Sequence, residues 1–266
     1  MFNIYRLTLY YLFILEIVAI ILGFLGKIPF STWGIVSSST ILILSCLVFN
    51  FILAKIFNAR SKIESVLITA LILALIISPG LPALFLILVS LLAMASKYLL
   101  AIKGRHIFNP AAIAVVLAAF LLGQSANWWI GTIWMMPFVL IGGLIIASRL
   151  RRLSEVVIFI FGVLALLFFT YLFRSGTSSA THVLRLALTT SSLLFFSFAM
   201  LTEPLTAPSN KNLRLIFTVL IAFLFVTPQL HPFGINLTPE LALCFGNAFA
   251  FIYKPCTPSG CTLEVN

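Results

Sequence analysis

Two short polar stretches in an otherwise apolar chain carry most of the side chains that can do chemistry. They are RHIFNPAA at residues 105–112 and TEPLTAP at residues 202–208. An amide such as that of Asn109 and the threonine hydroxyls of the second stretch can hydrogen-bond a polar ligand. The carboxylate of Glu203 can bind a cation, relay a proton or accept a hydrogen bond. A carboxylate in apolar surroundings is costly unless it is protonated, paired or hydrated, which makes Glu203 a functional candidate.

A second candidate carboxylate is Glu16, which stands in the apolar run YLFILEIVAI. We expect it to lie deep in the membrane, where it could couple to an ion. The competing interpretation is that both acids are structural, with Glu203 a residue at a helix end near the membrane surface. Glu240 follows Pro239 and is most simply an acid in the first turn of a helix, where the helix dipole favours it.

The composition of the chain indicates which kind of structure positions these side chains. The chain has 266 residues, of which 62% are hydrophobic and 8% are charged, against about 25% charged in a typical soluble domain. Repeated apolar runs indicate a polytopic α-helical membrane protein. The expected spans are residues 8–26, 35–54, 65–78, 83–96, 111–123, 131–148, 155–173, 186–201, 213–227 and 240–253. Several are shorter than the roughly 20 residues of a straight crossing, so some helices are expected to be broken or re-entrant.

The basic residues are distributed unequally between the loops. With ten spans, thirteen of the sixteen Lys and Arg residues fall at the termini and in the loops on one side of the membrane. The positive-inside rule then predicts a multi-pass protein of the inner (cytoplasmic) membrane with both termini in the cytoplasm. The net charge of +10 is explained by topology in the lipid bilayer, so no nucleic-acid partner is expected.

The two halves of the chain share a plan. Pro79 and Pro204 are 125 residues apart, and His106 and His231 are separated by the same distance. This repeated offset predicts a duplicated five-helix unit, and an odd number of helices inserts the second copy upside down. The fold class expected is therefore all-α, with about ten transmembrane helices in two inverted five-helix repeats and Pro-broken helices. The expected divisions are 1–125 for the first repeat, 126–254 for the second and 255–266 for a cytoplasmic tail.

Inverted repeats with broken helices often build a ligand site near the membrane midplane. Asn109 and Pro110 also fit a simpler role, with Asn as the N-cap and Pro at the first helical position. Both roles can hold together. Trp128, Trp129 and Trp134 are expected to form an aromatic belt at the membrane interface.

Three stretches give the chain a family likeness: SKYLLAIKGRHIFNPAAIAVVL, NWWIG and FAMLTEPLTAP. In these it resembles the RnfD/NqrB family. Members of that family are the flavin-carrying membrane subunits of the Rnf electron-transport complex and of the sodium-translocating NADH:quinone oxidoreductase. The likeness is closest to the short members and runs from about Lys97 to the end of the last expected span.

The resemblance implies a redox subunit of an oxidoreductase or translocase complex rather than a self-contained enzyme. Its cofactor would be FMN or riboflavin. It would pass electrons between a cytoplasmic reductase domain or partner subunit and a quinone or external acceptor, with Na⁺ or H⁺ movement coupled to the transfer. Non-covalent flavin is the expected mode, held by groups of the two polar stretches. The residues expected at this site are Asn109, Pro110, Thr202, Glu203 and Thr206, with Lys97 and Arg105 pairing with a phosphate.

A second flavin mode concerns Thr181. Larger members of the family attach FMN to the Thr of an S-x-A-T motif, and this chain reads SSAT at residues 178–181. The family pattern also includes an upstream Asp, whereas this chain has no Asp. A solvated external loop is therefore the favoured interpretation of the segment. For Lys97 and Arg105 the alternative to phosphate binding is positive-inside signalling. No metal site is expected.

Two functions of other classes remain open. Inverted repeats with broken helices also serve a transporter or channel for a small solute, and a membrane anchor for a reductase partner is a third interpretation. Bound flavin separates the first interpretation from the other two.

Overall fold

The computed structural model describes residues 4–59, 62–102, 105–189, 192–230 and 237–253, and these fold into two compact units. The first unit extends to Ile130 and the second begins at Gly131. The first contains α1 (Ile4–Phe24), α2 (Thr32–Ile56), α3 (Ile63–Ile76), α4 (Ala83–Leu99), the short strands β1 (Ala101–Ile102) and β2 (Arg105–His106), and α5 (Pro110–Leu122). The second contains α6 (Met136–Arg149), α7 (Leu153–Ser175), α8 (Thr177–Thr189), α9 (Leu193–Phe195), the π-helical turn η1 (Phe196–Met200), α10 (Lys211–Leu230) and α11 (Pro239–Tyr253).

The described chain is thus mainly helical, as expected from its apolar runs, with two short strands and with turns and loops between the helices. Among its helices, three are long and apolar enough to cross a membrane: Tyr5–Phe24, Thr32–Ile56 and Leu153–Ser175. A fourth crossing results if Thr177–Thr189 and Leu193–Met200, bent by 58°, count as one span. Five further apolar helices have 10–17 residues. The chain therefore has the helices of a membrane protein, whereas ten complete spans and the inverted repeat stay predictions.

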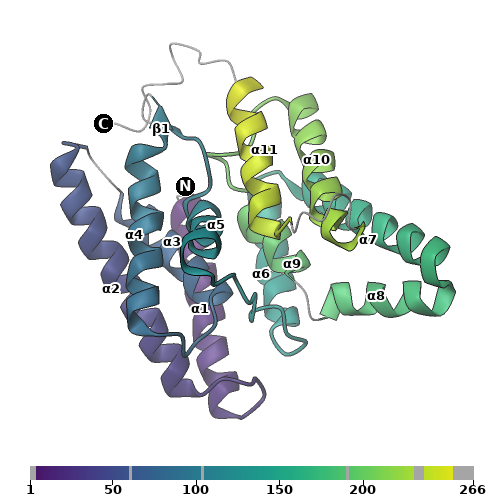
Figure 1. Ribbon diagram of the computed structural model, residues 1–266, viewed down its shortest axis with the longest axis horizontal. Coiled ribbons are helices and arrows are strands. Elements are labelled where there is room, and N and C mark those ends of the chain that lie inside the picture. The colour runs from purple at the N-terminus through teal and green to yellow at the C-terminus, as the bar shows by residue number, and fades with distance from the viewer. Residues whose placement is uncertain (1–3, 60–61, 103–104, 190–191, 231–236, 254–266) are drawn as a thin grey trace. The chain divides into compact units, whose positions relative to one another are not determined.

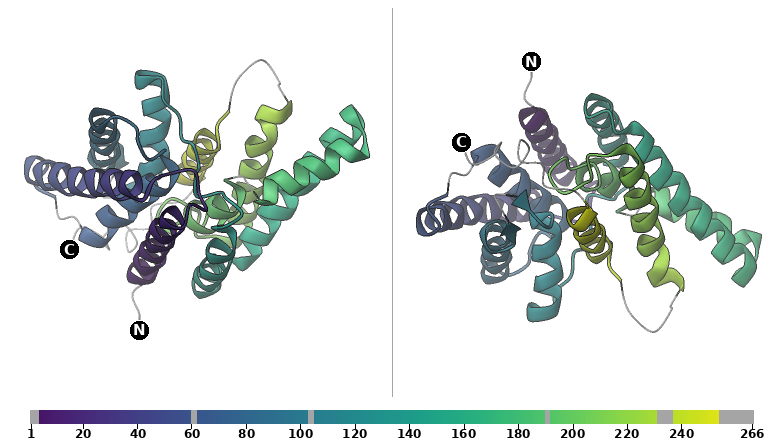
Figure 2. Two further views of the ribbon diagram at one scale, coloured as in Figure 1. Left: turned by 90° about the horizontal axis from the view of Figure 1, so that it is seen from below. Right: turned by 90° about the horizontal axis from the view of Figure 1, so that it is seen from above.

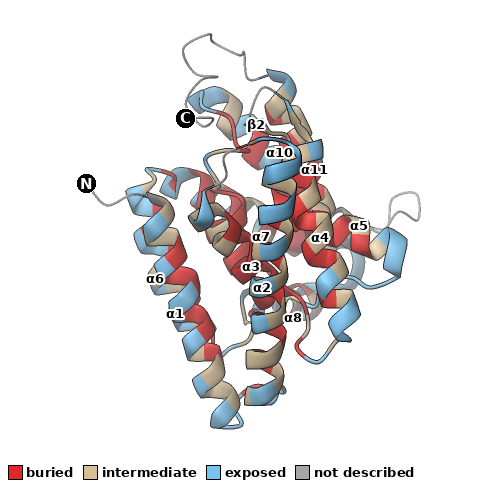
Figure 3. Ribbon diagram, turned by 90° about the vertical axis from the view of Figure 1, so that its left-hand side faces the viewer, coloured by how far each residue is buried: buried red, intermediate tan, exposed pale blue. Residues whose placement is uncertain are grey.

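In the first unit α2 packs lengthwise against α4, as Figure 1 shows, and α3 packs against α1 and α2. Apolar side chains such as those of Leu12, Leu42 and Leu71 form the interior, and these three have no exposed surface. Figure 3 shows the result on α1, where buried positions follow one side of the helix and exposed positions the other. Large exposed apolar side chains, among them Phe24 and Phe51, lie on these outer faces. Such surfaces suit lipid as the surrounding solvent.

In the second unit α7 packs against both α10 and α8. The chain reverses at Gly176, whose φ of 85° lies in the region that favours glycine, and α8 returns along α7 (Figures 1 and 2). The sequence predicts a solvated loop around Thr181, ahead of the expected span 186–201, and that prediction is wrong because Thr177–Thr189 forms a helix. Ala180 and Ala187, seven residues apart, are buried on one side of α8. Packing of this stripe against α7 outweighs the weak helix propensity of the Ser and Thr residues.

The tryptophans near the end of the first unit do not all behave as an interfacial belt. Trp129 is 4% exposed and donates its indole N–H to the carbonyl of Ala74 over 2.8 Å. The backbone N–H groups of Asn127 and Trp128 both donate to the carbonyl of Ile76. The segment therefore satisfies carbonyls at the end of α3, which no residue of that helix can reach. Burial of an aromatic ring that has a polar edge depends on such a partner.

Candidate functional site

The first polar stretch forms the approach to α5. The strands β1 and β2 pair antiparallel, with Ala101 opposite His106, and this hairpin joins the end of α4 to Asn109. The side-chain oxygen of Asn109 accepts hydrogen bonds from the N–H groups of Ala111 and Ala112 at 3.0 and 3.1 Å. Pro110 occupies the first turn of α5, where no N–H group is needed. The predicted cap is confirmed.

What distinguishes this cap from an ordinary one is its burial. Asn109 is 2% exposed, whereas Ser31, which caps α2 by accepting from the N–H of Gly34 at 3.0 Å, lies at the exposed start of its helix. The start of α5 is thus a set of oriented amide groups inside the protein. Such a helix start favours negative charge or a hydrogen-bond acceptor.

Lys97, predicted to meet a phosphate, lies in the last turn of α4 and is only 6% exposed. Its ammonium donates to the carbonyl of Ser65 at 2.8 Å and to the hydroxyl of Ser65 at 3.1 Å, which ties α4 to the first turn of α3. A phosphate at Lys97 would have to share the ammonium with Ser65.

His106 lies beside Lys97. Burial, together with the positive charge of Lys97, lowers the pKa of His106 to about 4, although a hydrogen bond with the backbone of Lys97 acts in the opposite direction. The ring is therefore neutral at pH 7. Its Nδ1 atom is buried and has no hydrogen-bond partner within the described residues. The neutral ring of His106, with one buried nitrogen available for a hydrogen bond, is therefore a further candidate group of this stretch. The sequence motif alone does not indicate it.

The second polar stretch follows a helix end of unusual form. Residues 196–200 form a π-helical turn, in which the N–H of Leu201 donates to the carbonyl of Phe196 at 2.9 Å. Single π turns inside helices are uncommon and frequently occur at functional sites. Gly143 of α6 makes room for this turn, since a Cβ atom there would lie 2.4 Å from Cγ of Phe198.

Two threonines after the π turn are buried, and Glu203 between them is half-buried. Thr202, 2% exposed, donates to the carbonyl of Phe198 at 2.7 Å. Thr206, 5% exposed, donates to a carboxylate oxygen of Glu203 at 3.2 Å, and the N–H of Ala207 donates to the carbonyl of Glu203 at 3.2 Å. The structure thus brings Thr202, Glu203 and Thr206 into one turn. Both threonine hydroxyls already donate within it, so they offer a ligand their oxygen lone pairs.

Glu16 is in the first unit, 6% exposed, near the middle of α1. One carboxylate oxygen accepts a hydrogen bond from the hydroxyl of Ser39 on α2, and the other is buried without a partner among the described residues. No Lys, Arg or His within the described parts forms an ion pair with it. A buried carboxyl group with one unused oxygen can hold a proton or contribute a ligand to a cation, so its ion-coupling role stays a prediction.

The remaining predicted positions have simple outcomes. Thr181 is exposed on α8 and donates to the carbonyls of Thr177 and Ser178, one turn earlier in the helix. The side chain of Arg105 and the whole of His231 lie outside the described residues. Asn109 belongs to the first unit and Glu203 to the second, and a site shared by the two stretches stays a prediction.

Thr218 is a buried polar residue that no sequence motif indicates. This residue of α10 has no exposed surface, and its hydroxyl has no partner in the described part of the chain. Threonine in a helix usually donates to a carbonyl one turn earlier, as Thr170 and Thr202 do here. The available signal was a single hydroxyl in the apolar run LIFTVLIAF.

Comparison of the chain with known proteins identifies no relative. No family model matches the chain, and no curated protein matches it.

Proposed function

We propose that this chain is a flavin-binding membrane subunit for electron transfer, of the kind found in the RnfD/NqrB family. The observation that carries the proposal is that polar side chains of both family-like stretches are buried at helix ends. Non-helical backbone within a membrane protein is tolerated where protein buries it or where it lines a cavity. Asn109, Thr202 and Thr206 are each at most 5% exposed. Loops at a membrane surface do not need their polar side chains to be buried to this extent.

The residues fit the polar edge of a flavin in part. The isoalloxazine ring presents one N–H donor and several acceptor atoms. The carboxylate of Glu203 and the lone pairs of Thr202 and Thr206 suit the ring N–H group. The buried hydroxyl of Thr218 is a donor in the same unit. When bound, a flavin supplies one- and two-electron transfer, and the protein supplies orientation and exclusion of water.

The rest of the proposal follows the same resemblance. The chain would span the inner membrane with ten helices in two inverted repeats, both termini cytoplasmic. A cytoplasmic reductase domain or partner subunit would deliver electrons, and a quinone or external acceptor would receive them. Glu203 and Glu16 are the proposed ion-coupling groups, because both are carboxyl groups among apolar helices.

Flavin content of variants tests the site residues. Asn109→Ala and Glu203→Gln are each expected to lower the flavin bound per purified protein by about tenfold, the loss of one good hydrogen bond to the ring. Asn109→Ser separates binding from capping, since Ser also caps helices but lacks the amide. We expect Asn109→Ser to restore stability without restoring flavin.

Glu64→Gln is the matched control for Glu203→Gln. Glu64, which is half-buried, forms an ion pair with the exposed Arg6 at 3.6 Å, and such solvated pairs contribute little to stability. Its replacement should leave the flavin content unchanged. Wild-type flavin content in both Asn109→Ala and Glu203→Gln would refute the assignment of these residues, and a chain without flavin would restore the transporter and anchor interpretations.

A further inference from the structure

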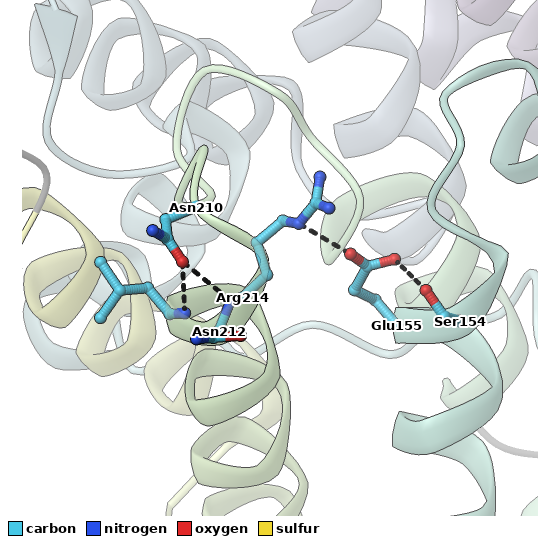
Figure 4. Close-up of polar contacts among 6 residues, drawn as sticks. Ser154, Glu155, Asn210, Asn212 and Arg214 are labelled. Atoms are coloured by element: carbon cyan, nitrogen blue, oxygen red, sulfur yellow. Dashed lines mark hydrogen bonds and ion pairs between the residues drawn. The ribbon is translucent and has the colours of Figure 1, made fainter.

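Two arginines and one glutamate meet where α7 and α10 begin in the second unit. Figure 4 shows Glu155, in the first turn of α7, facing Arg214 in the first turn of α10. Arg214 Nε lies 2.8 Å from a carboxylate oxygen of Glu155, at ion-pair distance but without hydrogen-bond geometry. The other carboxylate oxygen of Glu155 accepts from the hydroxyl of Ser154 at 3.1 Å. The single acid is therefore already engaged at both oxygens.

The second arginine, Arg152, directly precedes α7. Arg152 is 8% exposed, and its guanidinium makes no hydrogen bond or ion pair with a residue that the structure describes. Burial and the charge of Arg214 both lower the pKa of Arg152, and Glu155 partly offsets them. A guanidinium presents five N–H donors in a rigid fork, so this group is markedly short of acceptors.

The cluster thus combines two positive charges with one negative charge in a largely buried place. Arginines are almost never buried without a partner, because burying an unpaired charge is costly. The nitrogens of Arg152 are nevertheless not sealed from the surface, since none is a buried atom without a partner. The guanidinium therefore keeps a small exposed surface. The missing component is one further anion.

We propose that Arg152 and Arg214 form a binding site for a phosphate group. Two guanidinium forks match the oxygens of a phosphate through paired, charge-assisted hydrogen bonds. Arg152 directly precedes Leu153–Ser175, one of the helices long and apolar enough to cross a membrane, so the site lies where lipid headgroups begin. The phosphate comes from an anionic phospholipid or from a soluble phosphate. The proposal is independent of flavin binding.

The test is the thermal unfolding of the purified full-length chain in a zwitterionic detergent and phosphate-free buffer. Inorganic phosphate is titrated at constant ionic strength in one series, and short-chain phosphatidic acid in another, with short-chain phosphatidylcholine as the comparison lipid. A saturable rise in Tm with phosphatidic acid alone identifies a lipid headgroup as the source. A rise with inorganic phosphate as well identifies phosphate itself.

Arg152→Gln is expected to weaken the phosphate ligand by about ten- to a hundredfold. The matched control is Arg149→Gln, which removes one charge from an exposed position in the last turn of α6 and should keep the affinity within about twofold. Without ligand, Arg152→Gln should unfold at the same or a higher temperature than the wild type, because a buried repulsion disappears. A merely structural Arg152 would instead lower the ligand-free Tm and leave the affinity unchanged.

Glu155→Gln sharpens the test, because it removes the acid that competes with the ligand for Arg214. The affinity of this variant for the phosphate ligand should therefore be higher than that of the wild type. Should Arg152→Gln fail to fold, Arg152→Lys keeps the charge but loses the fork and is expected to bind about tenfold more weakly. The proposal is overturned if neither inorganic phosphate nor phosphatidic acid gives a saturable shift in Tm. It is also overturned if Arg152→Gln and Arg149→Gln bind the ligand with equal affinity.

Discussion

In the first unit α5 starts at a buried cap, whereas in the second unit the helix before TEPLTAP ends through a π turn. The cap at Asn109 satisfies two backbone N–H groups with one side chain. The π turn instead shifts the backbone bonding from four to five residues and is followed by hydroxyls that donate to nearby oxygens. The comparison shows that helix ends in apolar surroundings need internal partners, and that local side chains can provide them in different ways.

The largest difference expected between the two regions is in their response to acid. His106, three residues before the cap, has its pKa lowered to about 4 from an ordinary value near 6.5. Between these values the unfolded chain binds a proton that the folded chain does not, so stability falls as the pH drops through this window. The loss can reach about 3 kcal/mol.

Unfolding temperatures from pH 7 to pH 4 test this loss. The variant His106→Gln should lose much less stability on acidification than the wild type. His182→Gln, at an exposed position on α8, is the control and should retain the wild-type response. An unchanged acid response in His106→Gln would contradict a neutral ring at His106.

The π turn should be most sensitive to added volume. Gly143→Ala would place a Cβ atom 2.4 Å from Cγ of the Phe198 ring, so the ring or α6 must shift. We expect a loss of about 1–3 kcal/mol from overpacking. Gly162→Ala is the matched control, because its Cβ would meet the Ala222 Cβ at an ordinary 3.6 Å. Equal unfolding temperatures for the two variants would argue against tight packing at the π turn.

Loss of the N-cap at Asn109 is expected to have the next largest effect on stability. Asn109→Ala should lower the free energy of unfolding by about 1 kcal/mol, the usual contribution of an N-cap side chain. The exposed cap Ser31→Ala should cost less, because water can replace the lost acceptor at the start of α2. Denaturant unfolding of both variants measures the difference. A smaller loss at Asn109 than at Ser31 would disagree with the importance of burial.

The smallest expected effect is at the turn after η1. Thr206→Val removes the 3.2 Å hydrogen bond to Glu203 while keeping the shape of the side chain. A loss of about 0.5 kcal/mol in unfolding free energy is expected, at the low end of the net contribution of one hydrogen bond, because this bond is long and Glu203 is only half-buried. Thr206→Ser keeps the hydroxyl and should retain the bond. A loss as large as that of Asn109→Ala would show that Glu203 depends on Thr206 more than the structure indicates.

The sequence predicts features that depend on neighbouring residues. A cap involves residues two and three positions apart, so Asn109 and Pro110 indicate the start of α5 directly. Glu240 likewise falls in the first turn of α11, as predicted. Long apolar runs indicate helices in the same way, because a helix satisfies its own backbone groups.

Features that depend on contacts between distant segments are not predicted. The π turn at 196–200 depends on Gly143, and α8 depends on packing against α7. The pair of Glu155 and Arg214 joins residues 59 positions apart. In the sequence Arg214 indicates only the side of the membrane on which it lies, and nothing near Glu155 indicates that the two residues pair. The burial of Arg152 and the neutral ring of His106 likewise arise only when the helices pack.

The most direct test of the proposed function is the visible absorbance of the purified, detergent-solubilised chain, followed by acid precipitation. We predict a flavin spectrum whose chromophore is released into the supernatant, as expected for a non-covalent cofactor. Flavin retained in the pellet would contradict non-covalent binding and point to Thr181. A colourless protein from cells that make and load flavin would contradict the proposed function itself.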